Sequence, residues 1–577
     1  MLIRRFRKLL TTPRTSTSLE TRLWVVAGLA IAGVYAYLAM RKGFATQYVV
    51  QDDVRQHVFW MQRFLDPSVF PDDLIADYYQ AVEPLGFTLL FRIVAMAGID
   101  PILFSKILPI FLGLATTASC FAISMRLFPI PFAAFSASLL LNQVLWQRSD
   151  ISSATPRAFL YPLFLGFLFY LLRRSTIGCV LMIALSGLFY PPITFIEAGV
   201  LVLSLVRWEE GGIRLSRDGG DYRLSLTGLA VVVVLLFAFA MRAAEFGPVA
   251  TADEARMLPP ELAGARLSML RSNAWDRWLW NGQSGLLANM IPLPVALAAG
   301  LLLPVVMRYR GRFQLAEKLS PAVRLLPIIL LVSAVMFLAA HALLFRLYLP
   351  NRYTQHSLFV LMPLAAGPAI TILLDSLLQW TEVIKKNAGL AVSVSAIALL
   401  GVLLFSYPAL VEKFPLTRWI TGREPALYEF LLKQPKDTLI ASLSTEGNNL
   451  PTFTARPVLV AREYANPFHA SYYLELHQRY LDLLDAQYTS DTNTVEAFIE
   501  KYGVDLFVLD RDAFTPSYPT DKPVLARFKP IVQQIRARLE EGEVPVLLKQ
   551  MKDCTVLETE NLVVLNAECV GAAGLIR

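Results

Sequence analysis

Long apolar runs separated by short polar segments dominate the first 408 residues of the chain. A run of about 20 apolar residues crosses the hydrocarbon core of a bilayer as an α-helix. The pattern therefore predicts a polytopic α-helical membrane protein with about eleven transmembrane helices. The predicted spans are 23–40, 101–125, 130–147, 158–172, 175–190, 193–206, 224–241, 286–306, 325–345, 357–378 and 388–408.

The last part of the chain, 409–577, has a different pattern, with turn-forming residues and no long apolar run. It is long enough to bury a core of its own. Short strand-like pieces alternate with helical stretches, which predicts a small α/β domain. The expected strands are 437–443, 456–462, 504–510, 545–549 and 561–566, and the expected helices include 470–486 and 494–502.

The stretch 85–98 is apolar, but it is shorter than the roughly 20 residues that a transmembrane helix needs, and it contains Arg92. We predict that it is a helix lying at the membrane interface, inside a first outer loop of residues 41–100. With the N-terminus in the cytoplasm, this choice makes Lys and Arg more than twofold denser in the cytoplasmic segments, as the positive-inside rule requires. An odd number of spans then places 409–577 outside the cytoplasmic (inner) membrane.

The amino-acid composition excludes several other classes of protein. The chain is 55% hydrophobic and only 17% charged, which is too apolar for a soluble, disordered or coiled-coil protein. Its net charge of +7 is explained by basic cytoplasmic loops, so we expect no nucleic-acid partner. Four cysteines exclude a disulfide scaffold and a Cys-rich metal module. Cys554 and Cys569 both lie in the tail, where a disulfide and two separate thiols are both compatible with the sequence.

The first outer loop carries the strongest candidate chemistry. Asp52 and Asp53 follow the first span directly, and a helix over 51–64 would place Asp53 and His57 on one face. A carboxylate there can act as a general base on an acceptor hydroxyl, or it can bind a divalent cation. The alternative is a solvated amphipathic helix with surface acids. We take Asp52, Asp53 and His57 as the candidate catalytic residues.

A second group lies in the short outer loop before a late span. Guanidinium groups at headgroup level suit a phosphate or pyrophosphate, because Arg donates paired hydrogen bonds. Snorkelling of the same side chains to lipid headgroups is the alternative. The candidate substrate-binding residues are Arg346, Arg352 and Tyr353, together with Lys106 at the outer end of the second span.

Two weaker candidates are also predicted to lie outside. Asp150, in the loop 148–157, would add an acid to the first-loop pair, and the tail loop 463–469 would hang over the membrane face. We find no Cys/His metal spacing, no phosphate-binding glycine loop and no nucleophile elbow in the sequence. The sequence therefore does not support a cytoplasmic nucleotide-hydrolysing domain. A substrate used on the outer face would have to be attached to a membrane lipid.

This layout resembles the GT-C superfamily of integral-membrane glycosyltransferases. The matching features are Asp52-Asp53 after the first span, interfacial helices in the first outer loop, Arg352-Tyr353 before a late span and an outer α/β domain. The sequence Glu83-Pro84-Leu85-Gly86 looks like the family's His-Pro-Pro-Leu region but lacks its His. The layout covers nearly the whole chain, although each motif is short.

The resemblance implies transfer of a sugar from a polyprenyl-phosphate or polyprenyl-pyrophosphate carrier to an acceptor. It implies that Asp53 or Asp52 is the base or the metal-holding acid, and that Arg352, with Arg346, holds the carrier phosphate. The loop has no Asp-x-Asp, so dependence on Mg²⁺ or Mn²⁺ at Asp52 and Asp53 stays open. The alternatives are a transporter or flippase for a lipid or polar solute and a non-catalytic membrane assembly protein. A transporter would carry polar or broken helices near the midplane, whereas the polar residues here cluster on one face.

Overall fold

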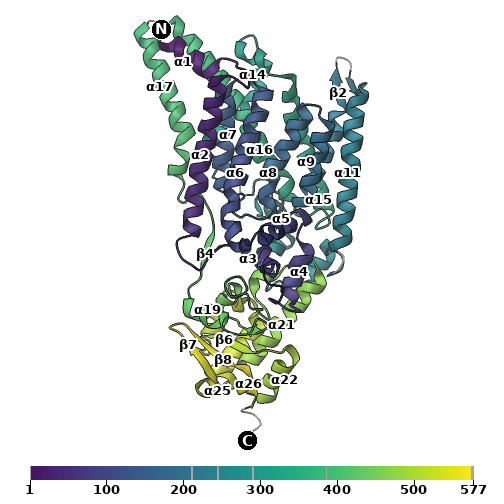
Figure 1. Cartoon of the computed structure of the whole chain (residues 1–577), viewed down its shortest axis with the longest axis vertical. Coiled ribbons are helices and arrows are strands. Elements are labelled where there is room, and N and C mark those ends of the chain that lie inside the picture. Colours follow the sequence, from purple (N-terminus) through teal and green to yellow (C-terminus); the bar gives the residue numbers. More distant parts are fainter. Residues whose placement is uncertain (1, 210–211, 244–245, 289–291, 385, 573–577) are drawn as a thin grey trace.

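The computed structural model describes residues 2–209, 212–243, 246–288, 292–384 and 386–572. Figure 1 shows a tall layer of helices lying side by side, with a smaller mixed helix-and-strand region at one end. The N-terminus lies at the far end of the helical layer and the C-terminus at the tip of the smaller region (Figure 1). The protein is therefore elongated, and the predicted fold class is confirmed.

Long apolar helices build the upper layer. By length and composition, six helical segments in the described part of the chain are able to cross a membrane. They lie in α2 (Leu19–Gly43), α6 (Pro101–Leu127), α11 (Gly219–Ala243), α15 (Leu325–Ala342), α16 (Pro350–Val383) and α17 (Lys386–Phe405). Shorter apolar helices stand among them: α7 (Pro131–Trp146), α8 (Pro156–Leu172), α9 (Thr176–Phe189) and α10 (Ile193–Ser204). A multi-pass membrane protein is the architecture that these helices form.

Ten of the eleven expected spans are α-helices, but α7, α8, α9 and α10 are shorter than the six that can cross a membrane by length. The remaining expected span is not a continuous α-helix. The segment predicted at 286–306 contains the 3-10 helix η5 (Val295–Leu302) and the short α14 (Leu303–Arg308) instead of one continuous α-helix. Pro292 and Pro294 precede η5, and proline removes a backbone donor and disfavours helix in the residue before it. At Gly300 the chain approaches α16 so closely that a Cβ would lie 3.0 Å from the Met362 carbonyl oxygen.

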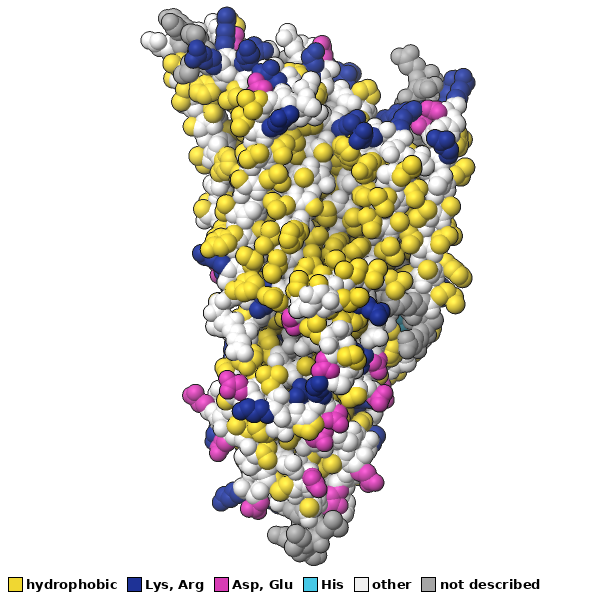
Figure 2. Space-filling model, viewed as in Figure 1, with side chains coloured by type: hydrophobic (Ala, Val, Ile, Leu, Met, Phe, Trp, Pro, Cys, Tyr) yellow, Lys and Arg dark blue, Asp and Glu magenta, His cyan; other side chains and the backbone are white. Residues whose placement is uncertain are grey.

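The surface of the helical layer matches a bilayer. On the face that Figure 2 shows, a broad apolar band crosses the middle of the layer, and Lys and Arg gather at the end that holds the N-terminus. At that end lie the amphipathic helix α1 (Leu2–Thr11) and the hairpin of β2 (Val206–Glu209) and β3 (Gly212–Leu215). Acidic side chains are more frequent at the opposite end (Figure 2).

The first outer loop folds into short elements at the junction of the two regions (Figure 1). They are β1 (Val49–Gln51), α3 (Val54–His57), η1 (Phe59–Phe64), α4 (Leu74–Val82) and α5 (Leu85–Met96). The helix expected over 51–64 thus begins only at Val54. Gln51 instead ends β1, which pairs antiparallel with β4 (Trp419–Thr421) from far along the chain, and Asp52 and Asp53 form the turn that leads into α3. The helix α5 occupies the stretch that we predicted to be interfacial.

A four-stranded sheet organises the C-terminal region, in the order β5-β6-β8-β7. β5 (Ile440–Ala441) is parallel to β6 (Leu506–Asp510), whereas β8 (Leu562–Asn566) is antiparallel to both β6 and β7 (Thr555–Glu558). Around the sheet lie α19 (Pro425–Leu432), α21 (Ala470–Tyr488), α22 (Thr492–Tyr502), α24 (Lys529–Glu540), α25 (Val546–Cys554) and α26 (Ala567–Ala572).

Two strand predictions in this region were wrong. The segment 456–462 forms only an isolated bridge between Val458 and Ile440, and 545–549 begins the helix α25 after Pro545. The strand pattern of 545–549 is three apolar residues, too few for periodicity to separate a strand from a buried helical turn. The expected helices over 470–486 and 494–502 are present as α21 and α22.

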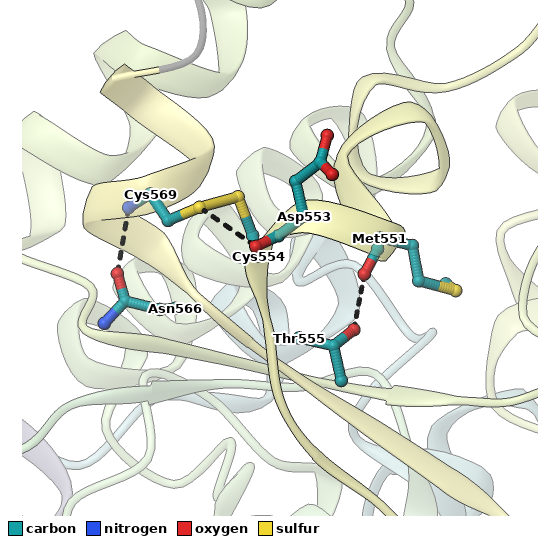
Figure 3. The surroundings of a disulfide bond; sticks show 6 residues. All are labelled: Met551, Asp553, Cys554, Thr555, Asn566 and Cys569. Carbon is teal, nitrogen blue, oxygen red and sulfur yellow. Dashed lines mark hydrogen bonds between the residues drawn. A yellow bond between two sulfur atoms is a disulfide. The ribbon is translucent and has the colours of Figure 1, made fainter.

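Cys554 and Cys569 form a disulfide (Figure 3). Cys554 ends α25 and Cys569 lies in α26, so the bond ties together two helices on either side of the β7–β8 hairpin. Of the two readings that the sequence left open, the structure has the disulfide. The other two cysteines, Cys120 and Cys179, are buried free thiols in the helical layer.

Candidate functional site

The backbone around Asp53 is held from two sides. The pairing of β1 with β4 continues into Asp52, whose N–H donates to the Arg418 carbonyl at 3.1 Å. The side chain of Gln51 accepts a hydrogen bond of 2.7 Å from the Asp53 N–H. Asp53 then lies at the N-terminus of α3. The strand pairing and the following helix together direct the Asp53 carboxylate toward α8.

On α8, Arg157 bridges two carboxylates. Its Nη2 donates to Asp53 Oδ2 at 2.8 Å, and its Nε lies 3.3 Å from Asp150 Oδ1. The other Asp150 oxygen accepts a hydrogen bond of 2.6 Å from Tyr161, whose hydroxyl also lies 2.9 Å from Nδ1 of His356 on α16. A polar chain therefore runs from the first outer loop, through α8, to α16.

The electrostatic balance favours a charged Asp53. Burial by itself would raise the pKa of Asp53, but nearby positive charges outweigh burial and lower it. The contributing groups are Arg157, His57, Arg418 and Arg352. The Asp53 side chain nevertheless keeps 30% of its surface exposed, so the carboxylate is ionised and accessible.

His57 is paired with Glu83, from the Glu-Pro-Leu-Gly segment. Its Nδ1 hydrogen-bonds to Glu83 Oε1, and the Glu83 side chain is almost fully buried. Burial alone would lower the pKa of His57, but Glu83, followed by Asp53, raises it above the ordinary value. His57 and Asp53 influence each other's pKa, and Glu83 hydrogen-bonds to the imidazole.

Asp52 points to a different set of partners. It forms an ion pair with Arg55, which also donates to Glu463 Oε2 at 3.1 Å and to Asn449 Oδ1 at 2.9 Å. The Gln56 side chain donates to the carbonyl of the same Glu463 at 2.9 Å. The tail loop 463–469 thus packs directly on the first outer loop. In this position Asp52 helps to join the two regions.

Arg352 lies in the first turn of α16, half-buried, one turn before His356. Its positive charge lies close enough to Asp53 to help lower that pKa. In the part of the chain that the structure describes, no direct ion pair joins the Arg352 guanidinium to a carboxylate, and its influence on Asp53 acts through space. The arrangement therefore presents a guanidinium that is free to bind an anion beside an ionised acid.

The other predicted binding residues take separate places. Arg346 is exposed, and its charge acts on Glu254 in α12 (Ala252–Met257). The Lys106 ammonium lies 5.3 Å from the centre of the Phe44 ring, beside the end of α2. Tyr353 is buried, and its hydroxyl donates to the Leu347 carbonyl at 2.6 Å. The structure thus groups Asp53, His57, Asp150 and Arg352, but not these three.

Sequence reasoning left out Arg157, Tyr161, Glu83 and Arg418 as site residues. Arg157 follows Pro156 in the first turn of α8. Because proline is favoured at the first position of a helix, Pro156 marks the start of α8 and could have drawn attention to Arg157 at the outer end of that helix. Glu83 opens the segment compared with the family's motif, which pointed to that position. Arg418 had no sequence signal, because only the pairing of β1 with β4 brings it to Asp53.

Comparison with known proteins gives a likeness of structure only. No family model matches the chain. No curated protein sequence matches it either. The apo crystal structure of the Archaeoglobus fulgidus oligosaccharyltransferase matches with a TM-score of 0.55 and 13% identity, over 89% of this chain and 72% of that one.

Two further solved structures are similar. Archaeoglobus fulgidus AglB, in complex with an inhibitory peptide and a dolichol-phosphate, matches with a TM-score of 0.54 and 12% identity, over 90% of this chain and 72% of that one. ArnT from Cupriavidus metallidurans bound to undecaprenyl phosphate has a TM-score of 0.45 at 12% identity, over 94% of this chain and 98% of that one. The two Archaeoglobus fulgidus matches show that the chain has the fold of that oligosaccharyltransferase, which agrees with the GT-C resemblance of the sequence.

Proposed function

We propose that the protein is a membrane glycosyltransferase that moves a sugar from a polyprenyl-linked phosphate carrier to an acceptor hydroxyl on the outer face of the cytoplasmic membrane. Asp53 accepts the proton of the acceptor, and Arg352 binds the carrier phosphate. His57 and Asp150 belong to the surrounding charge network. The acceptor oxygen forms a bond to the sugar carbon, the bond from that carbon to the phosphate oxygen breaks, and the carrier leaves with the electron pair.

The observation that carries this proposal is the Asp53 carboxylate, which Arg157 holds at 2.8 Å and which keeps 30% of its side chain exposed. Arg352 is one of the positive charges that lower its pKa. A general base must be ionised and reachable, and Asp53 is both. A phosphate leaving group needs a cation to stabilise its developing charge. Among the described residues Arg352 forms no direct ion pair with a carboxylate, although its charge helps to lower the pKa of Asp53. The dolichol-phosphate bound to AglB, a protein of the same fold, supports a lipid-phosphate substrate class.

Orientation and domain roles are part of the same proposal. Residues 1–408 form the membrane part and 409–577 an extracytoplasmic domain. Lys and Arg gather at the end that holds the N-terminus, which favours that end as cytoplasmic (Figure 2). The Cys554–Cys569 disulfide favours an oxidising compartment for the opposite end.

The test uses the purified full-length chain in lipid nanodiscs, incubated with a panel of polyprenyl-phosphate and polyprenyl-pyrophosphate sugars labelled in the sugar. We expect release of the sugar-free carrier phosphate from at least one donor, by transfer to an added acceptor or to water. The Asp53→Asn variant should not release it. Absence of release from every donor, or equal release by Asp53→Asn, would contradict the proposed function.

A further inference from the structure

We propose that Arg157 occupies the position at which a divalent cation would bridge Asp53 and Asp150, so that the site works with a built-in guanidinium in place of a metal. The catalytic part of this statement rests on the proposed function above, whereas the statement about metal binding does not. Arg157 is then a positioning residue, which holds the Asp53 carboxylate and supplies the positive charge between the two acids.

The contacts of Arg157 support this assignment. The two carboxylates come from different loops, and one guanidinium meets both, at 2.8 Å to Asp53 and 3.3 Å to Asp150. Mg²⁺ and Mn²⁺ prefer carboxylate oxygens that converge on one point at about 2.0–2.2 Å. A guanidinium between those oxygens holds them apart, and its single positive charge already offsets half of their combined negative charge. Only 22% of the Arg157 side chain is exposed, so it is fixed in the site and does not simply extend into solvent.

The remaining acids near Asp53 are also committed to protein partners. Asp52 pairs with Arg55, Glu83 pairs with His57, and the second oxygen of Asp150 accepts from Tyr161. Within the described ranges, no three His, Cys, Asp or Glu side chains converge as a ligand set. The donor set at this position therefore does not fit a divalent cation, and Arg157 is the physical reason.

Removal of the Arg157 guanidinium should turn the site into one that binds a divalent cation. In Arg157→Ala, Asp53 and Asp150 would lose the one cation that contacts both of them, and two such carboxylates attract a divalent ion. The probe is Mn²⁺, measured by electron paramagnetic resonance on the full-length protein in detergent. We expect that Arg157→Ala binds Mn²⁺ at least tenfold more tightly than the wild type, and that Arg157→Ala/Asp150→Asn loses this gain.

A matched control is available at the other end of α8. Arg174 also bridges two aspartates, lying 2.7 Å from Asp218 and 3.2 Å from Asp221, but Arg207 continues to neutralise Asp221 when Arg174 is removed. Arg174→Ala should therefore gain no Mn²⁺ affinity. If Arg157→Ala is not monodisperse, Arg157→Gln replaces it, because glutamine removes the charge and keeps a polar side chain.

Two results would overturn the inference: Mn²⁺ binding by the wild type that Asp53→Asn or Asp150→Asn weakens tenfold, or no gain of affinity on neutralising Arg157. A parallel assay measures transfer by the wild type with EDTA, where we expect less than a twofold change. Loss of transfer with EDTA and its recovery with Mn²⁺ would also contradict the inference. Failure of every donor would count against the glycosyltransferase instead, while the Mn²⁺ measurements still decide the role of Arg157.

Discussion

Arg157 Nη2 donates a hydrogen bond of 2.8 Å to Asp53 Oδ2, across 104 residues of sequence. The contact joins the first outer loop to the start of α8. Hydrogen bonds between charged groups are stronger than neutral ones, and this one fixes both the position and the charge state of Asp53. The proposed chemistry depends on that fixed carboxylate.

The first prediction concerns Asp53 itself. Asp53→Asn removes the proton acceptor with almost no change in size, so transfer should fall by about 100-fold or more. The measurement is the rate of carrier phosphate release, with size-exclusion chromatography to show that the variant remains folded. The control is Asp66→Asn. Asp66 is an exposed acid of the same loop that pairs with Lys436 of the C-terminal region, and its variant should keep full activity. Normal activity of Asp53→Asn would remove the assignment of Asp53 as base.

A second prediction separates charge from geometry at Arg352. Arg352→Ala should raise the donor KM by about tenfold to a hundredfold, as expected for the loss of hydrogen bonds to a charged group. Arg352→Lys keeps the charge but loses the paired donors, so its donor KM should lie between those of the wild type and Arg352→Ala. Arg346→Ala is the matched control, since Arg346 is exposed and lies near Glu254. An unchanged donor KM and rate in Arg352→Ala would count against phosphate binding.

The third prediction is a pH dependence of stability. Glu83 and Asp53 raise the pKa of folded His57 above 6.5, the value of a free imidazole. Their contribution is therefore fully present below pH 6.5 and is lost as the pH rises through the raised value. Thermal unfolding between pH 5 and 9, a range of about four units, should show a decline that Glu83→Gln reduces.

The control for this titration is His477, whose pKa burial lowers. Its contribution has the opposite sign, because the folded state favours the neutral ring and stability rises as the pH approaches 6.5. His477→Gln should therefore leave the decline above pH 6.5 in place. An identical pH profile for wild type and Glu83→Gln would show that the His57–Glu83 pair does not contribute.

The fourth prediction follows from the disulfide. Alkylation of the denatured protein without reductant should label Cys120 and Cys179 only, and reduction should expose all four cysteines. Cys569→Ser opens a loop with a sequence separation of 15 residues and should destabilise the C-terminal region by about 2–4 kcal/mol. Proteolysis of that region in increasing urea measures the loss. Cys120→Ala should leave this proteolysis profile unchanged.

The sequence alone determined the elements whose physics is local. Apolar length identified the membrane helices, and helical periodicity identified α21 and α22. The hydrophobic pattern was less informative where strand pairing with a distant segment, or proline, decided the backbone conformation. Gln51 joined β1 because β4 offered it hydrogen bonds, and Pro292 and Pro294 interrupted the span expected over 286–306.

The candidate site required the tertiary structure. The sequence indicated Asp53 and Arg352 through their places beside predicted spans, but it contained no signal that Arg157 lies between Asp53 and Asp150. Residue type and spacing report on neighbours within a helix or strand. The partner of a carboxylate is decided by which helix ends meet in space, and packing between distant segments determines that.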